Sequence, residues 1–282
     1  MPPTVSVVIP LFNGLPYVKQ SLDSVLAQTT LVDEIVIVDG GSTDGSLEWL
    51  RGLDIPNLIK DELPSGTTAA ENWTRCTELA TSDFVKLLCQ DDCLYPDAIR
   101  KQVADLQGNP NCNMAISQRD IVDARGSTIA SKRGCQGLPA GVVSGIEAIR
   151  ASYLKGTNIF GEPVTTLFRR EPMQEALPWL DDKPYVLDIH FDTTILVNSY
   201  VFVRHESLGA FRVSSSSWST QLAKVQKDQF RMWQRHAQSM IGTVKTHEKI
   251  ASRVNLEIQT QTRRLAYVYL RIRRSLESRA GQ

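Results

Sequence analysis

The sequence lacks features that define several broad classes of protein. It has no window of 18 uninterrupted apolar residues, which excludes a standard transmembrane helix. Its first residues lead into an apolar, β-branched stretch with no basic region before it, so we expect no signal peptide. Acidic and basic residues number 31 each, so the chain has no formal net charge at pH 7. We expect no nucleic-acid partner.

Cysteine is scarce and irregularly placed. The chain has five cysteines, an odd number, and no two of them form a Cys-x-x-Cys pair. They are Cys76, Cys89, Cys93, Cys112 and Cys135. We expect free thiols, which indicates a reducing cytoplasm as the location of the protein.

The chain also lacks a glycine-rich turn after its first apolar stretch. A dinucleotide-dependent oxidoreductase requires Gly-x-Gly-x-x-Gly at that point, and residues 10–14 do not supply it. A sugar nucleotidyltransferase is expected to carry a glycine-rich basic turn there, which is missing too. Both absences count against these two uses of an α/β sheet.

The first hundred residues alternate between strand and helix patterns, and a hydrophobic content of 42% is enough to fill a core. The expected strands are 5–10, 34–38, 57–60 and 84–88, and the expected helices are 16–28, 46–51, 68–80 and a helix that ends near residue 106. Such alternation predicts an α/β fold with a parallel, doubly wound sheet.

The pattern weakens after about residue 105. We expect strands at 113–117 and 200–203, helices at 145–152 and 188–196, and a loop, strand and helix in succession across 161–175. The last sixty residues have helical periodicity.

Two adjacent carboxylates, Asp91 and Asp92, follow the apolar strand that begins at Phe84. Ligands of open α/β sheets bind at the carboxyl ends of strands, so this pair is a candidate for holding a cation. The alternative is that Asp91 caps the next helix and Asp92 lies in a solvated turn. Right-handed crossovers are expected to bring Phe12 and Asp39 to the same rim, which favours a ligand site.

These residues occur in an order that resembles family 2 of the inverting glycosyltransferases. The resemblance is dense over the first hundred residues and thinner afterwards. It rests on Ser6–Asn13, Tyr17, Ser24–Leu26, Gln28–Thr29, Glu34–Gly45, Ala70, Asn72, Asp91–Asp92, Gly161–Pro163, Leu167–Arg170, Asp188 and Arg212.

The resemblance implies a GT-A (Rossmann-like) fold with a mostly parallel sheet flanked by helices. The GT-A domain would span 1–218, with a nucleotide-sugar-binding half at 1–104 and an acceptor-binding half at 105–218. A basic helical extension would occupy 219–282. The implied reaction transfers a sugar from a nucleotide-diphosphate sugar to an acceptor hydroxyl with inversion, in cell-surface polysaccharide or glycoconjugate biosynthesis. A catalytically silent carbohydrate-binding or scaffolding relative, and a sugar nucleotidyltransferase, are the alternatives.

The resemblance also assigns roles to single residues. Asp92 matches the ligand of a divalent cation, Mg²⁺ or Mn²⁺, and Asp91 matches its neighbour that approaches the ribose. The residues matched to donor binding are Pro10, Phe12, Asn13, Asp39, Ser42, Asn72, Asp91 and Arg212. The family usually has two acids where this chain has Asp39 and Gly40, so the base contact is expected to fall to Asp39.

Asp188 falls where the family keeps its general base. It follows an apolar stretch, where partial burial would tune its pKa. The alternatives are that Asp188 only caps its helix and that Asp192, one turn later, is the base. Arg212 precedes a serine-rich loop, 214–217, and either closes on the diphosphate with that loop or belongs to a plain surface loop.

The C-terminal part of the chain is strongly basic. From Gln221 onward it has thirteen lysines and arginines against four acidic residues. Such a tail is expected to lie on the inner membrane face beside a lipid-linked saccharide acceptor, to pack against the body or a second subunit, or simply to present a solvated helix face.

Removing residues 263–282 tests the membrane interpretation. We expect weaker association with anionic liposomes at low salt, because each lost arginine contributes about 1 kcal/mol near such a surface. Liposome flotation measures this, with uncharged liposomes as the control. Unchanged association would contradict the membrane interpretation.

Overall fold

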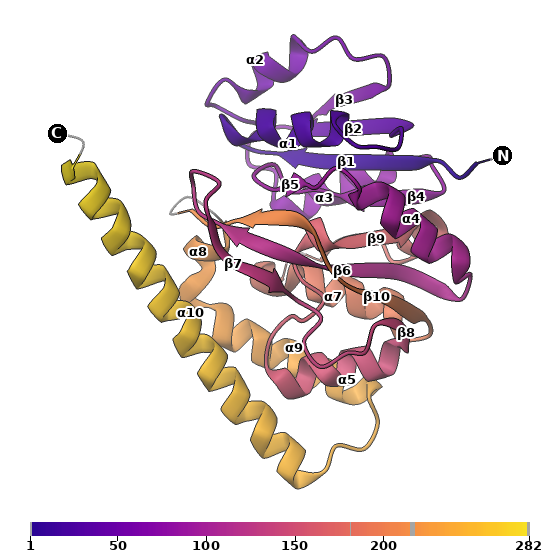
Figure 1. The fold of residues 1–282 in the computed structure, drawn as a ribbon, viewed down its shortest axis with the longest axis vertical. Helices are drawn as coiled ribbons and strands as arrows, with labels where there is room; N and C mark the ends of the chain where they lie inside the picture. Colours follow the sequence, from indigo (N-terminus) through magenta and orange to yellow (C-terminus); the bar gives the residue numbers. More distant parts are fainter. Residues whose placement is uncertain (1, 181, 215–217, 281–282) are drawn as a thin grey trace.

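A mixed sheet lies at the centre of the molecule (Figure 1). The computed structural model describes residues 2–180, 182–214 and 218–280, and ten strands of this part form the sheet. They are β1 (Val5–Leu11), β2 (Glu34–Asp39), β3 (Leu58–Glu62), β4 (Phe84–Leu87), β5 (Cys93–Leu94), β6 (Cys112–Val122), β7 (Thr128–Arg133), β8 (Gly141–Ser144), β9 (Thr166–Arg169) and β10 (Tyr200–Arg212).

The sheet is parallel in its first half and mixed in its second. Its order is β3-β2-β1-β4-β9-β6-β10-β5, with β7 beside β6 and β8 beside β10. Strands β1 to β4 are mutually parallel, and β10 is parallel to β6. Strand β9 lies antiparallel between β4 and β6. The α/β fold that we expected, with a mostly parallel sheet, is therefore confirmed.

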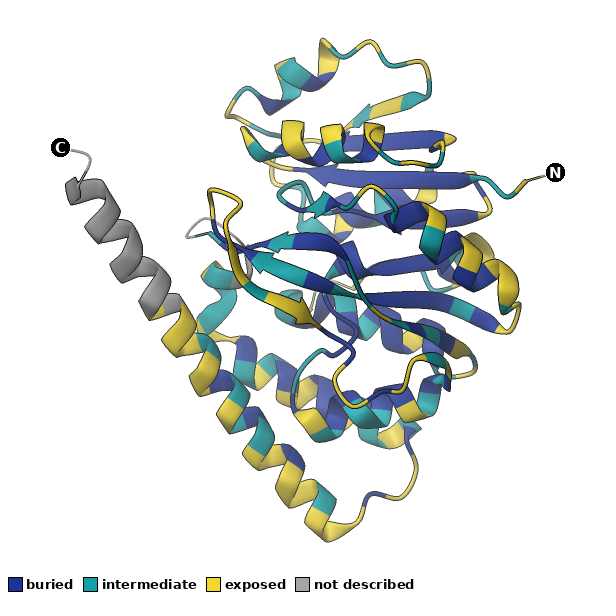
Figure 2. Ribbon diagram, viewed as in Figure 1, coloured by how far each residue is buried: buried dark blue, intermediate teal, exposed yellow. Residues whose placement is uncertain are grey.

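Helices cover both faces of the sheet. They are α1 (Tyr17–Leu26), α2 (Ser46–Arg51), α3 (Ala69–Glu78), α4 (Ala98–Gly108), α5 (Gly145–Lys155), α6 (Arg170–Glu175), α7 (Leu187–Leu196), α8 (Trp218–Gln221), α9 (Gln226–Met240) and α10 (Thr246–Ala280), with 3₁₀ turns η1 (Pro163–Thr165), η2 (Pro184–Val186) and η3 (Leu222–Lys224). Helices α1, α2 and α4 pack on one face. Helices α3, α5, α6, α7, α9 and α10 pack on the other, so the strands between them are mostly buried (Figure 2).

Two strands are longer than the sequence pattern predicts. Strand β6 extends to Val122 instead of residue 117, and β10 extends to Arg212 instead of residue 203. Both continue through polar residues, and the pairing of β10 with β6 shifts register between Arg204 and Ser207. The apolar alternation ends at such irregular points, although the hydrogen-bonded ladder continues.

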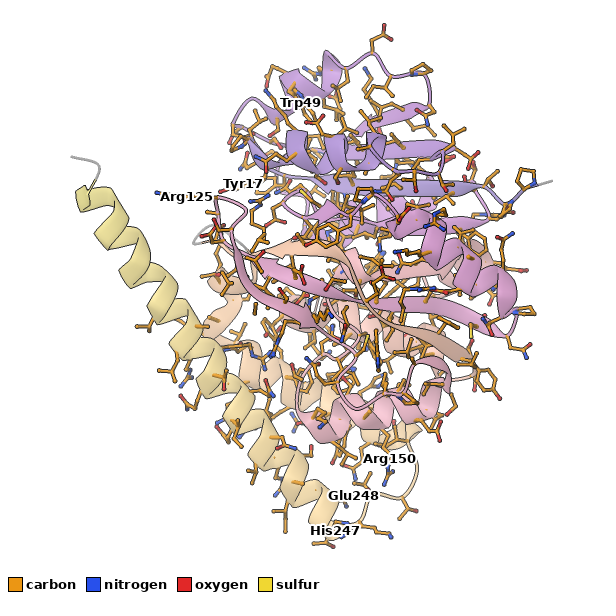
Figure 3. All side chains as sticks on the ribbon, viewed as in Figure 1. Tyr17, Trp49, Arg125, Arg150, His247 and Glu248 are labelled. Atoms are coloured by element: carbon orange, nitrogen blue, oxygen red, sulfur yellow. The ribbon has the colours of Figure 1, made fainter. Side chains whose placement is uncertain are left out.

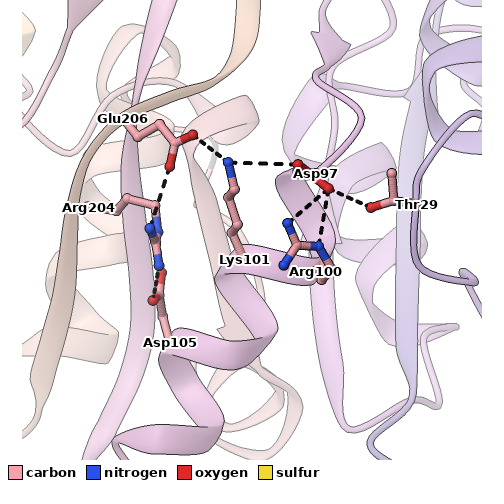
Figure 4. A network of polar contacts seen from close by, with 7 residues as sticks. All are labelled: Thr29, Asp97, Arg100, Lys101, Asp105, Arg204 and Glu206. Atoms are coloured by element: carbon pink, nitrogen blue, oxygen red, sulfur yellow. Dashed lines mark hydrogen bonds and ion pairs between the residues drawn. The ribbon is translucent and has the colours of Figure 1, made fainter.

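Ion pairs connect the middle of β10 to α4 (Figure 4). Arg204 donates to both carboxylate oxygens of Asp105, from Nε at 2.8 Å and from Nη2 at 2.5 Å. Lys101 Nζ lies 2.5 Å from Glu206 and 3.9 Å from Asp97. The Asp105 side chain is buried, so its paired, two-point contact with Arg204 fixes β10 against the helix.

The basic helical extension that we expected is present as α9 and α10. Phe230 and Trp233 of α9 and Leu256 of α10 are buried in the same core as the sheet. Arg150 of α5 donates to both oxygens of Glu248 at 2.6 and 2.7 Å, at the start of α10 (Figure 3). The division of the chain at residues 218 and 219 stays a prediction.

Helix α10 lies directly against the end of α5. Gly156 ends α5 with φ +63°, in the left-handed region that favours glycine. A Cβ atom at this position would lie closer than 3.0 Å to the backbone of Leu256. Asn255 Nδ2 also donates to the Leu154 carbonyl at 2.8 Å. Glycine is therefore required here both by the conformation and by the approach of α10.

Gly156→Ala is expected to destabilise the protein by more than about 2 kcal/mol. The left-handed conformation alone costs an alanine roughly 1–2 kcal/mol, and the contact with α10 adds to this. Urea unfolding measures the change. Gly108→Ala is the matched control, since nothing lies within 4 Å of its added Cβ, and it should be neutral or slightly stabilising. Equal effects of the two substitutions would contradict the close packing of α10.

Candidate active site

The loops that follow β1, β2 and β4 meet at one edge of the sheet, as we expected from the strand pattern. Gln90, after β4, donates to the Phe12 carbonyl at 2.8 Å and accepts from the Phe12 amide at 2.7 Å. The Asn13 amide donates to Ser42 Oγ at 2.9 Å, and the Thr43 amide donates to Asn13 Oδ1 at 2.8 Å. Side chains thus join the three loops into one rim.

Three residues predicted to contact the base lie on or below this rim. Pro10 is buried inside β1. Phe12 is 52% exposed, so its ring is accessible to a ligand. Asn13 has φ +49°, a conformation that asparagine tolerates better than most residues. Their contact with a base stays a prediction.

Asp39 is the last residue of β2, and only one of its two carboxylate oxygens accepts hydrogen bonds from described residues. Its Oδ1 accepts from the Gly41 amide at 2.9 Å and from the Ser42 amide at 2.8 Å. Its Oδ2 is buried and has no hydrogen-bond partner among the residues that the structure describes. A buried acceptor without a partner is costly in free energy, so this oxygen indicates a place where a ligand donor fits.

Asn72 supports the rim from below. Its Nδ2 donates to the Leu11 carbonyl at 3.0 Å, and the same carbonyl accepts from the Gly40 amide at 2.7 Å. A Cβ atom on Gly40 would lie 2.9 Å from Asn72 Nδ2. Asn72 therefore positions the ends of β1 and β2, and the predicted contact with the donor stays a prediction.

The acid pair lies between β4 and β5. Asp92 is fully buried; its Oδ1 accepts from the Arg212 amide at 2.9 Å, and its Oδ2 has no hydrogen-bond partner in the described part of the chain. Burial raises the pKa of Asp92 well above its usual value, and the charge of Asp91 raises it further. Helix α4 begins at Ala98, so Asp91 does not cap it, and Asp92 is not in a solvated turn.

The acid pair suits a divalent cation. A positive ion would offset the burial and the neighbouring Asp91 charge that raise the pKa of Asp92, and its buried carboxylate oxygen without a partner among the described residues offers a ligand. Within residues 2–180, 182–214 and 218–280, no group of three or more His, Cys, Asp or Glu side chains forms a metal site. A few protein ligands suffice for Mg²⁺ when substrate phosphates supply the others.

Arg212 holds the acid loop in place from the end of β10. Its Nε donates to the Asp91 carbonyl at 2.9 Å and its Nη2 to Gln20 Oε1 at 2.9 Å. Its guanidinium lies 4.7 Å from the ring centre of Tyr17, which Figure 3 shows near the β6–β7 turn. Arg212 is buried, and its predicted contact with the diphosphate stays a prediction. Residues 215–217 of the predicted serine loop lie outside the described residues.

A cavity of about 750 Å³ opens beside the acid pair. Asp91 and Cys89 line it on the side of the first half of the chain, and Glu162 and Asp188 line it from the second half. Glu162 accepts from Arg119 Nη2 at 2.8 Å. This volume lies within the range of ligand sites, and the cavity brings together acids from both halves of the chain.

Asp188 has the properties of a general base. The pKa of Asp188 is raised to about 7, mainly by burial and to a smaller extent by the nearby charge of Glu162, while hydrogen bonds partly oppose the increase. Its Oδ2 accepts from Asn158 Nδ2 at 3.0 Å and its Oδ1 from the Ile189 amide at 2.7 Å. A carboxylate with a pKa near 7 is suited to accept a proton.

Asp192, the alternative base, is 2% exposed and does not line the cavity. Its Oδ2 has no hydrogen-bond partner among the described residues, and burial raises its pKa well above the usual value. A hydroxyl in the cavity reaches Asp188 more directly than Asp192.

Sequence reasoning did not assign roles to Asn158, Arg119 or the residues of α10 that line the cavity. Asn158 lies thirty residues before Asp188, and only the tertiary structure brings the two into contact. Glu162 belongs to the Gly161–Pro163 motif, which is the sequence signal that indicates this side of the cavity. All five cysteines are free thiols, as expected.

Comparison with known proteins identifies the fold and the family. An uncharacterized glycosyltransferase of Rickettsia felis is 27% identical over 249 residues, which cover 80% of this chain and 39% of that protein. The chondroitin synthase of Pasteurella multocida is 29% identical over 131 residues, 46% of this chain and 14% of that protein. The chain thus spans only about two fifths of the Rickettsia relative.

Residues 1–349 of S. aureus TarS superpose with a TM-score of 0.65 at 16% identity, over 91% of this chain and 72% of that one. The same TarS fragment has also been solved with UDP-GlcNAc, and this complex gives the same TM-score and identity. The likeness confirms the GT-A fold that we expected. The family model of Glycosyl transferase family 2 matches residues 6–177, more than half of the chain. The chain therefore belongs to glycosyl transferase family 2.

Proposed function

We propose that this protein transfers a sugar from a uridine-diphosphate sugar to an acceptor hydroxyl, with inversion and with a divalent cation. The observation that carries the proposal is the placement of its carboxylates. Asp39 and Asp92 each have a buried oxygen without a hydrogen-bond partner among the described residues, and Asp188 lines the adjoining cavity. The reaction needs a hydrogen-bond acceptor for the nucleobase, a ligand for the cation and a group that takes the proton of the attacking hydroxyl. We assign these roles to Asp39, Asp92 and Asp188 in that order.

Asp39 is suited to contact a uracil base. Its unpartnered Oδ2 accepts hydrogen bonds only, and the imide N–H of uracil is a donor. The ring of Phe12 lies at the same rim and offers a surface for the base. TarS has been solved with UDP and with UDP-GlcNAc, which supports a uridine nucleotide for this chain as well.

Asp91 and Asp92 would hold the cation, Mg²⁺ or Mn²⁺. Asp91 lines the cavity, and Asp92 has the buried free oxygen, so the two offer ligands from neighbouring positions. When bound, the cation neutralises the charge that develops on the departing diphosphate. Arg212 contributes by holding the Asp91 carbonyl and the Asp92 carboxylate in place.

Asp188 would accept the proton of the attacking hydroxyl. Asn158 and the Ile189 amide orient its carboxylate, and a pKa of about 7 makes it an effective base near neutral pH. A single in-line attack that one base assists inverts the configuration of the anomeric carbon.

The acceptor is proposed to be a saccharide or a lipid-linked saccharide in the synthesis of a cell-surface polysaccharide or glycoconjugate. The name of the Pasteurella relative, a chondroitin synthase, supports a polysaccharide. No helix of the described chain is both long and apolar enough to cross a bilayer. We propose a cytoplasmic location, with the exposed side chains of Ile250, Val254 and Ile258 on α10 meeting a membrane or a second subunit.

Binding of nucleoside diphosphates tests the donor. UDP with Mn²⁺ is expected to raise the melting temperature more than CDP, GDP or ADP, since a ligand at about 100 times its Kd stabilises by about 2.7 kcal/mol. Asp39→Asn should abolish the preference for UDP, because the amide places a donor where the carboxylate has an acceptor. Asp92→Asn should remove the part of the rise in melting temperature that depends on Mn²⁺. Thermal-shift scans measure both, with the exposed Asp228→Asn as control. Failure of the wild-type chain to respond to UDP would refute the proposed donor.

Substitution of Asp188 tests the base. Asp188→Asn is expected to lower kcat for transfer of the sugar to water about 10²–10⁴-fold while the response to UDP remains. In the wild type, kcat should rise with pH and level off above about 7, because only the ionised carboxylate accepts a proton. Release of UDP from UDP-GlcNAc measures the rate. A larger loss for Asp192→Asn than for Asp188→Asn would transfer the role to Asp192.

A further inference from the structure

Helix α10 forms one wall of the cavity. Gln259, Thr262, Arg263 and Ala266, which span two turns of the helix, line it together with residues of the sheet. The preceding turns are fixed to α5, through the Arg150–Glu248 pair and the hydrogen bond from Asn255 to the Leu154 carbonyl. The wall is therefore a built part of the site.

Three basic side chains from different elements line this cavity. Arg133 ends β7, Lys155 ends α5, and Arg263 belongs to α10. The Lys155 side chain packs against the loop that follows Arg133, since a Cβ atom on Gly137 would lie 3.2 Å from Lys155 Cε. Asn255, two turns before Arg263, contacts the residue next to Lys155. The end of α5 thus lies beside both the loop that follows Arg133 and α10, which carries Arg263.

Among the described residues, no carboxylate forms an ion pair with these three cations. Within the described chain, neither Arg133 nor Lys155 forms an ion pair. Arg263 donates to the hydroxyl of Tyr185 at 2.8 Å, and its guanidinium lies 5.9 Å from the centre of that ring. The fourth basic side chain in the cavity, Arg119, is paired with Glu162. Three positive charges are left facing the cavity.

The acidic side chains of the cavity already have other partners or proposed functions. Glu162 is paired with Arg119, Asp91 belongs to the acid pair, and Asp188 accepts from Asn158. The donor and its cation would occupy the side of Asp91, because the rim residues lie there. The basic side is therefore the part of the cavity that the acceptor would enter.

We infer that Arg133, Lys155 and Arg263 form a subsite for an anionic group of the acceptor, a phosphate or carboxylate on a saccharide chain. The inference rests on the proposed transferase function and specifies its acceptor class. Guanidinium and ammonium groups bind both kinds of oxyanion through charge-assisted hydrogen bonds. The Tyr185 hydroxyl holds the Arg263 guanidinium in place, so less conformational freedom is lost when the anion binds.

Binding of labelled oligosaccharides to the full chain tests the inference. The probes are a glycerol-phosphate hexamer, a galacturonic acid hexamer and neutral maltohexaose, measured by fluorescence anisotropy with UDP and Mn²⁺ present. At least one anionic hexamer is expected to bind ten-fold or more tightly than maltohexaose, and to weaken as salt rises. The tighter anionic hexamer identifies the oxyanion as phosphate or carboxylate.

Substitutions locate the binding on the cavity wall. Arg263→Gln and Lys155→Gln are each expected to raise the Kd for the anionic hexamer roughly ten-fold, as the loss of one charged hydrogen bond does. Arg253→Gln is the matched control, because it removes an exposed charge from the same helix outside the cavity and should leave the Kd unchanged.

Equal binding of maltohexaose and both anionic hexamers would overturn the inference, and so would an unchanged Kd in both Arg263→Gln and Lys155→Gln. The melting temperature with UDP, measured on the same samples, separates this failure from that of the donor. A UDP response without anion binding refutes the acceptor class alone. Anion binding without a UDP response refutes the proposed donor and leaves the subsite in place.

Discussion

The hydrogen bond between the Arg212 amide and the Asp92 carboxylate connects the two halves of the molecule. It joins the end of β10 to the loop after β4, although the two residues are 120 positions apart. The guanidinium of Arg212 then holds the Asp91 carbonyl and Gln20. Since Asp92 is fully buried, this contact fixes where both acids of the pair lie. The cavity beside them depends on that position.

Buried polar atoms without partners are costly in free energy, and two of those among the described residues follow or end strands of the first half. Asp39 Oδ2 and Asp92 Oδ2 belong to the strand ends and following loops of β1, β2 and β4, which form the rim. A folded chain tolerates such atoms when a ligand donates hydrogen bonds to them, because those bonds offset part of the free energy lost on burial. The rest of the sheet, with its fully buried β1 and β2, provides the stability that this requires.

The second half of the chain shapes the other side of the cavity by packing more than by motif. Asp188 acquires its raised pKa from burial and from the neighbouring charge of Glu162. The α10 wall acquires its position from the close contact at Gly156 and from the buried Leu256. A helix that the sequence presented as a basic extension thus contributes Arg263 to the same cavity as the acid pair.

The sequence by itself determined the four parallel strands of the first half, the paired acids and the family, because apolar runs, turn residues and motifs are local in the chain. It placed Asp39, Asp91 and Asp188 correctly at the ends of elements. Only the tertiary structure decided that β9 is antiparallel, that Arg212 is buried under the acid loop, and that α10 lines the cavity. Those features arise from contacts between residues far apart in the chain, and local sequence patterns do not predict such contacts.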